Sequence, residues 1–124
     1  MKLKRLAATT SVLLLTAMGS VVVSTAAPAS ASCSHANTYG DGRYGNWFEV
    51  ANVNIRSGPH TSCGVVAYGQ TSHLVDYYCF VTGDSVTANG RTSNTWTYLR
   101  DVTTGYHGWV SDTLLWDWGS DTTC

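Results

Sequence analysis

Lysine and glutamate are almost absent from this chain of 124 residues. Lys2 and Lys4 are the only lysines, and Glu49 is the only glutamate. Both residue types favour helices, so their scarcity argues against a helical domain. Without lysine, the chain beyond its first few residues also lacks the basic patches that binding to nucleic acid or anionic lipid requires. We therefore expect neither of these as a partner.

The N-terminal segment has the features of a secretory signal peptide. A long apolar run follows its basic start, and Ala29 and Ala31 occupy the small-residue positions of a cleavage site. We predict a signal peptide over residues 1–31, and therefore a secreted protein with no membrane insertion after cleavage. An uncleaved anchor and a lipoprotein are the alternatives. The anchor is disfavoured because polar residues interrupt the apolar run. The lipoprotein is disfavoured because a lipoprotein signal has a leucine shortly before its cysteine, and Cys33 has none there. The basic residues at the start are Lys2, Lys4 and Arg5.

Without residues 1–31, four arginines face eight acidic residues, which gives a formal net charge of −4. The remaining 93 residues would form one small domain whose core needs support from cross-links. An even number of cysteines in an exported domain predicts two disulfides, and four cysteines allow three connectivities. Two of them lie symmetrically about Thr71 in a turn-like segment. A hairpin folded there would pair Cys63 with Cys79 and leave Cys33 to pair with Cys124.

The rest of the chain is typical of strands and turns. Apolar and polar residues alternate from residue 53, β-branched and aromatic runs flank Thr71, and no helical period is sustained. We predict an all-β fold with five or six short strands. Residues 32–52 would be a Gly- and Tyr-rich lead-in with a first strand, and residues 116–124 a C-terminal tail. Residues 83–94 would form a polar loop with a turn at Asn89-Gly90. The expected core residues are Val53, Ile55, Val66, Val75, Tyr77, Leu99 and Val110.

Two motifs in this order resemble the bacterial SH3 (SH3b) domain of exported actinobacterial proteins. They are NIRSGP at residues 54–59 and GWVS at residues 108–111, with a hydrophobic pair of strands and a Trp-bearing strand between them. The resemblance covers residues 53–115. It implies a small SH3-like barrel, a tight helical turn in the SDTL segment, and a groove that recognises cell-wall peptides such as those of peptidoglycan. For Arg56 we expect a structural role, in which it caps loop carbonyls or pairs with an acidic neighbour.

Five tryptophans and seven tyrosines exceed what a small core needs. Trp96 and Tyr98 share a strand face opposite Leu99, and Trp109 lies opposite Val110. We predict that Trp96, Tyr98 and Trp109 line an open binding groove. The alternative is that these rings cover a thin barrel, and Trp116 and Trp118 are expected to pack over the barrel end. The expected acceptors for peptide amines are Asp84, Asp112 and Asp76.

Catalytic signals are weak. His60 and Cys63 have the spacing of half a metal site or of a thiol nucleophile, but a disulfide is the better interpretation for an exported domain. The other histidines lack metal-ligand spacing, and no pair of carboxylates has a recognisable acid/base context. We expect no enzyme activity, metal or cofactor. The predicted function is a secreted module that binds peptidoglycan peptides. The alternative is an extracellular protein-interaction factor, inhibitor-like or toxin-like, that presents loops such as residues 83–94.

Overall fold

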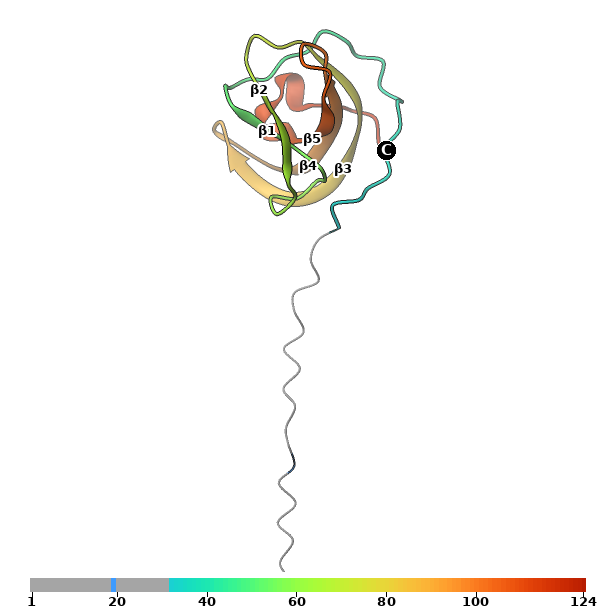
Figure 1. Ribbon diagram of the computed structural model, residues 1–124, viewed down its shortest axis with the longest axis vertical. Helices are drawn as coiled ribbons and strands as arrows, with labels where there is room; N and C mark the ends of the chain where they lie inside the picture. Colours follow the sequence, from blue (N-terminus) through green and yellow to red (C-terminus); the bar gives the residue numbers. More distant parts are fainter. Residues whose placement is uncertain (1–18, 20–31) are drawn as a thin grey trace, which may run out of the picture.

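The computed structural model describes Gly19 and residues 32–124 (Figure 1). Apart from Gly19, the predicted signal peptide lies outside the described residues. In the described part of the chain, five antiparallel strands form one sheet in the order β2-β1-β5-β4-β3, which confirms the predicted all-β fold. No helix among the described residues is long and apolar enough to cross a membrane. The strands are β1 (Val53–Arg56), β2 (Val65–Gly69), β3 (Val75–Ala88), β4 (Arg91–Asp101) and β5 (His107–Ser111).

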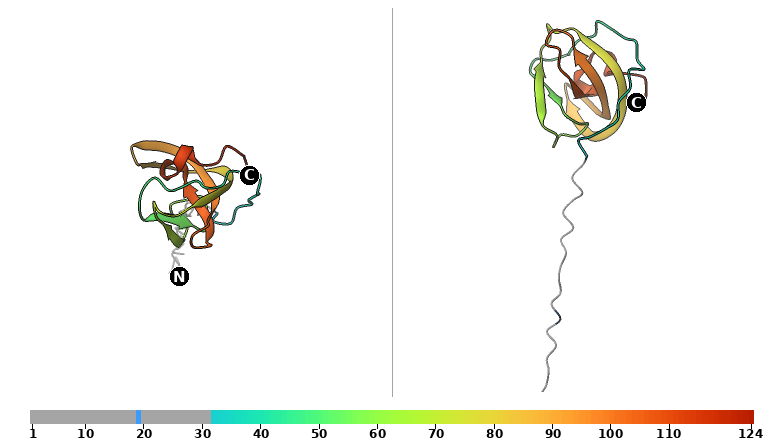
Figure 2. Two further views of the ribbon diagram at one scale, coloured as in Figure 1. Left: turned by 90° about the horizontal axis from the view of Figure 1, so that it is seen from above. Right: turned by 45° about the vertical axis from the view of Figure 1, so that its right-hand side comes forward.

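The sheet curls on itself, so that its inner face encloses the main core (Figure 1 and Figure 2). Two short 3₁₀ turns follow β5, namely η1 (Asp112–Leu114) and η2 (Trp116–Trp118). The first lies in the SDTL segment, where a tight helical turn was expected. Alternation along the strands sends every second side chain inward, as predicted for all but one of the expected core residues. The inner core consists of Phe48, Val53, Ile55, Val75, Tyr77, Leu99, Val110 and Leu115.

Val66 is the exception: its side chain is 43% exposed, so its assignment to the core was wrong. Ala67 pairs with Ile55 across β1 and β2, and Ile55 points into the core. Ala67 therefore packs on the core, and the neighbouring Val66 points outward. A shift of one residue along a strand reverses the face of every side chain, and the apolar run VVA does not show which residue faces in.

The segments before β1 and after η1 belong to the same folded unit. Residues of the N-terminal segment run along the outer edge of β3, and the C-terminus lies beside them (Figure 1). Asn46 forms a bridge with Val75, and Thr123 forms a parallel bridge with Phe80. Because β3 is the last strand of the sheet, these contacts satisfy backbone groups that would otherwise form an open edge.

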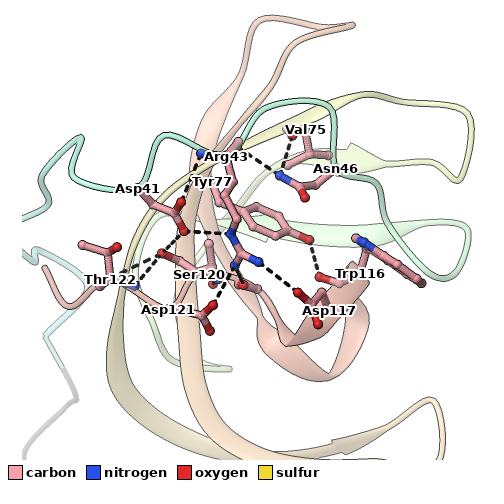
Figure 3. Close-up of polar contacts among 12 residues, drawn as sticks. Asp41, Arg43, Asn46, Val75, Tyr77, Trp116, Asp117, Ser120, Asp121 and Thr122 are labelled. Atoms are coloured by element: carbon pink, nitrogen blue, oxygen red, sulfur yellow. Dashed lines mark hydrogen bonds and ion pairs between the residues drawn. The ribbon is translucent and has the colours of Figure 1, made fainter.

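Arg43 ties these two segments together (Figure 3). Its Nε lies 3.3 Å from a carboxylate oxygen of Asp41, which is buried. Its terminal nitrogens reach the C-terminal segment, with one 3.0 Å from Asp117 and the other donating to the carbonyl of Gly119. Ser120 donates to the same Asp41 carboxylate at 2.7 Å. A single guanidinium thus holds the N-terminal and C-terminal segments against each other.

The disulfides join Cys33 to Cys63 and Cys79 to Cys124. Two disulfides were predicted and are present, but the favoured pairing of Cys63 with Cys79 was wrong. That pairing assumed that the strands on either side of Thr71 are neighbours in the sheet. Instead β2 pairs with β1, and β3 lies at the opposite end of the strand order. The first bond fastens the N-terminal segment to the β1–β2 loop, and the second fastens the C-terminus to β3.

The expected polar loop over residues 83–94 is instead part of a long hairpin, so the loop assignment was wrong. β3 continues to Ala88 and β4 begins at Arg91, with an irregular register between Thr82 and Val86. Asn89 and Gly90 both have positive φ, 54° and 68°, which confirms the predicted turn. The hairpin reaches beyond the body of the barrel (Figure 2).

Candidate functional site

Trp96 and Trp109 lie on the outer face of the sheet, opposite Leu99 and Val110 as predicted, but they do not form an open groove. Each is only 2% exposed. Together with Val81 they make a second buried cluster. The indole Nε1 of Trp96 donates to the carbonyl oxygen of Asp84 at 2.9 Å. These two rings are therefore part of a second core on the outer face of the sheet.

Three pieces of chain that lie far apart in the sequence cover this cluster. The His35 ring packs edge-on against Trp109, with 5.5 Å between ring centroids. Cys124 packs against the same cluster at the other end of the chain. The β3–β4 hairpin covers Trp96 and touches Pro59, since a Cβ on Gly83 would lie 1.9 Å from the Pro59 carbonyl oxygen. Only glycine allows so close an approach at position 83.

Asp84 was expected as a ligand acceptor but is engaged within the protein. Its carboxylate accepts hydrogen bonds from the backbone N–H and the hydroxyl of Thr61, at 2.8 and 3.0 Å. The other carboxylate oxygen lies 2.8 Å from Nδ1 of His60. The hydrogen bond with His60, followed by those from Thr61, lowers the pKa of Asp84. This carboxylate fastens the β1–β2 loop to the hairpin.

Asp112 was also expected as an acceptor, and it is buried at 2% exposure. Its Oδ1 accepts a hydrogen bond from the hydroxyl of Thr97 at 2.6 Å. Burial raises the pKa of Asp112 to about 6, against the smaller opposing effect of hydrogen bonds that favour the carboxylate. Asp112 is therefore an internal titrating group below the outer face and has no access to a ligand.

The raised pKa of Asp112 makes stability depend on pH. An unfolded aspartate titrates near pH 4 and the folded one near pH 6, so its contribution to stability is greatest below pH 4 and is lost as the pH rises to 6. The loss is about 2–3 kcal/mol. We expect Asp112→Asn to remove this dependence, so that the variant gains stability relative to the wild type between pH 4 and pH 7. Urea unfolding across this range measures the difference. Parallel profiles for wild type and variant would contradict it.

A cleft of about 160 Å³ opens on the same outer face, between β1, the β1–β2 loop, the hairpin and η1. Its apolar lining comes from Val86, Leu114 and Trp96, and its polar lining includes the side chains of Asn54 and Arg56. The remaining lining residues are Thr61 and Ser111. A cleft of this size accepts one side chain or one ring substituent of a larger ligand.

Arg56 also has the structural role expected for it. A terminal nitrogen donates to the carbonyl oxygen of Cys63 at 2.9 Å and so holds the β1–β2 loop beside the cleft. In the described part of the chain all four cysteines are in disulfides, so Cys63 is not a free thiol beside His60. No three acidic, histidine or cysteine side chains among the described residues are placed to hold a metal ion.

Of the predicted groove residues, Tyr98 alone keeps a partly exposed ring. It lies beside Tyr78 and His107 rather than in the cleft. Trp116 and Trp118 are each close to half exposed. Trp116 stacks on Trp47 with 4.3 Å between ring centroids, which places it against the N-terminal segment.

The sequence analysis missed several residues that line the cleft. For Asn54 the sequence did contain a signal, because strand alternation places it on the outer face beside Arg56. Val86 and Leu114 had none, because the positions of the hairpin and η1 over β1 depend on the order of strands in the sheet. The missed residues are Asn54, Thr61, Val86, Ser111 and Leu114.

Comparison with known proteins gives two relatives from Bacillus subtilis (strain 168). The uncharacterized protein YraI is 43% identical over 74 residues, which cover 57% of this chain and 61% of the relative. The uncharacterized protein YraJ is 38% identical over 77 residues, which cover 57% of this chain and 62% of the relative. The chain therefore spans about three-fifths of the length of these relatives. No family model matches the chain. No solved structure matches it either.

Proposed function

We propose that this protein is an exported, non-catalytic binding module of the bacterial SH3 (SH3b) type that recognises a cell-wall peptide in the cleft. The observation that carries the proposal is that both motifs of the resemblance meet at the cleft. Asn54 and Arg56 come from NIRSGP, and Ser111 comes from GWVS. The backbone brings them together, because Arg56 pairs with Trp109 across β1 and β5.

The lining of the cleft suits a short peptide. The amide of Asn54 can donate and accept hydrogen bonds with peptide groups, and the hydroxyl of Thr61, which donates to Asp84, can still accept one. Val86 and Leu114 offer contacts to an aliphatic side chain. Peptidoglycan stem peptides supply both kinds of group. The cleft takes the place of the open tryptophan groove as the binding site, with Trp96 as part of its wall.

Export is supported by the cross-links. Two disulfides in so small a domain are typical of proteins that act in an oxidising compartment. They fasten both terminal segments, which suits a module that has to persist outside the cell.

The proposal predicts binding to purified sacculi that depends on the cleft. Val86→Glu places a charge in the cleft and should weaken binding about 30-fold, the loss typical of removing a central contact of an interface. Val102→Glu is the matched control, because Val102 is exposed and outside the cleft, and it should bind like the wild type. Soluble stem peptides should displace the wild-type protein from the sacculi.

Two outcomes would contradict the proposal. If the wild-type protein does not bind sacculi, the cell wall is not its target. If Val86→Glu binds as well as Val102→Glu, the cleft is not the site. The projecting β3–β4 hairpin favours the second candidate, an extracellular protein-interaction factor, and an exposed Thr87→Arg change near its tip would then be the variant that affects function.

A further inference from the structure

Four aromatic rings gather on the outer face of the sheet, away from the cleft lining. Tyr78 of β3, Tyr98 of β4 and His107 of β5 lie 5.9 to 6.2 Å apart between centroids, and their planes differ by no more than 41°. Tyr39 of the N-terminal segment adds a ring edge-on to Tyr78 at 4.6 Å. We call these four residues the tyrosine patch. Tyr39 and His107 are exposed, and the other two rings are partly exposed.

Two side chains of opposite charge, Asp76 and Arg100, flank the patch, and no side-chain hydrogen bond or ion pair of either is found in the described part of the chain. Arg100 faces Asp76 of β3 on one side and His107 of β5 on the other. The buried Nε of Arg100 has no hydrogen-bond partner. The arginines at positions 43, 56 and 91, by contrast, all make hydrogen bonds to the protein. A buried donor without a partner is rare in folded proteins. No hydrogen bond of the other guanidinium nitrogens of Arg100 is found among the described residues either, so these nitrogens are the donors that the patch offers to a ligand.

The combination of flat rings and an unpaired donor and acceptor selects one class of ligand. A sugar ring offers an apolar C–H face for an aromatic ring, and hydroxyl groups that both accept from a guanidinium and donate to a carboxylate. A phosphorylated or acidic ligand would meet the Asp76 carboxylate and the negative charge of the domain. A purely apolar partner would strip water from Arg100 and Asp76 without compensation.

The tyrosine hydroxyls add to the hydrogen-bonding capacity of the patch. Burial raises the pKa of Tyr78, and burial together with the neighbouring tyrosines raises the pKa of Tyr98. Both hydroxyls therefore remain protonated donors at any physiological pH. Each also keeps its lone pairs as acceptors.

We propose that the tyrosine patch, together with Asp76 and Arg100, binds a neutral polysaccharide chain. The patch lies on the same strand face as the cleft, since Tyr98 is two residues along β4 from Trp96. Its lining residues are nevertheless different from those of the cleft. Saccharide binding here does not depend on the peptide site, and it goes beyond the proposed function.

Titration of the disulfide-bonded protein with two neutral sugar polymers tests the proposal. The probes are the hexamer of N-acetylglucosamine and the hexamer of glucose, both β-1,4-linked, followed by calorimetry. We expect millimolar or tighter binding of at least one hexamer. Binding of the first alone indicates a cell-wall type of glycan, and binding of both indicates a general affinity for neutral glycans.

Variants separate the patch from other surfaces. Tyr78→Ala and Arg100→Gln should each weaken hexamer binding at least tenfold. Tyr68→Ala should stay within twofold of the wild type, since Tyr68 is an exposed tyrosine on β2, outside the patch. No side-chain hydrogen bond or ion pair of Arg100 is lost in Arg100→Gln within the described part of the chain, so this variant remains informative if Tyr78→Ala destabilises the fold. Val86→Glu should bind the hexamers normally as long as it stays folded, because Val86 lines the cleft and packs on the second cluster but is not part of the patch.

The outcome that overturns the proposal is equally definite. If neither hexamer binds at millimolar concentration, or if Arg100→Gln and Tyr68→Ala bind alike, the patch is not a saccharide site. That result would leave the sacculus assay with Val86→Glu unaffected, so the two proposals fail separately.

Discussion

Replacing Trp96 with alanine should lower the free energy of unfolding by about 3–5 kcal/mol. The ring is almost fully buried, and its removal leaves a cavity between the sheet and the hairpin. The change also removes the donor of the hydrogen bond to the Asp84 carbonyl. Urea denaturation at pH 7, followed by far-UV circular dichroism, measures the effect. Trp109→Ala should be similarly costly, because its ring is buried in the same cluster.

Two other variants provide reference values for this loss in the free energy of unfolding. Ile55→Ala removes a side chain of the main core and should cost about 2–5 kcal/mol. Trp116→Ala removes a ring that is 44% exposed, so its cost should be clearly smaller. If Trp96→Ala and Trp109→Ala were as stable as the wild type and lost only binding, the rings would belong to an open groove after all.

Strand alternation predicted the face on which Trp96 and Trp109 lie, but it could not predict that the face is covered. Alternation reports which side chains share a face, and it is set by local backbone geometry. The cover comes from His35, Cys124 and Val86 of β3, none of which lies on the strands that carry the two rings. Segments without regular structure carry no periodic signal that shows where they dock.

The lack of a local signal for long-range contacts also explains why the disulfide pairing and the cleft were not predicted. The number of cysteines predicted two cross-links, whereas the pairing depends on the order of strands in the sheet. Symmetry about Thr71 would decide the pairing only if β2 and β3 were neighbours, and they are at opposite ends of that order. The cleft depends on the same topology, because β1, η1 and the hairpin meet only in the folded sheet. Composition and pattern were sufficient for the fold class, since all-β alternation and turn residues are local properties.

Removing the disulfide between Cys79 and Cys124 should destabilise the domain by about 4 kcal/mol. The bond closes a loop with a sequence separation of 45 residues, and loss of that constraint enlarges the unfolded ensemble. A small domain typically has only about 5–15 kcal/mol of stability in total. The Cys79→Ala, Cys124→Ala double variant should therefore lose a large part of its stability, and thermal denaturation followed by circular dichroism measures the fall in its melting temperature.

The second disulfide provides a matched comparison, because its sequence separation of 30 residues gives nearly the same entropic cost. The two disulfides differ in the segment that each one holds in the folded protein. Without its disulfide, the C-terminus is held to β3 by the two hydrogen bonds that Phe80 makes with Thr122 and Cys124, at 2.7 and 3.0 Å. In the Cys79/Cys124 variant, the Phe80 amide should therefore exchange with solvent faster than in a Cys33→Ala, Cys63→Ala variant of similar stability. Equal exchange at Phe80 in both variants would mean that the C-terminal segment stays docked on β3 without its cross-link, and that the disulfide acts on the unfolded chain alone.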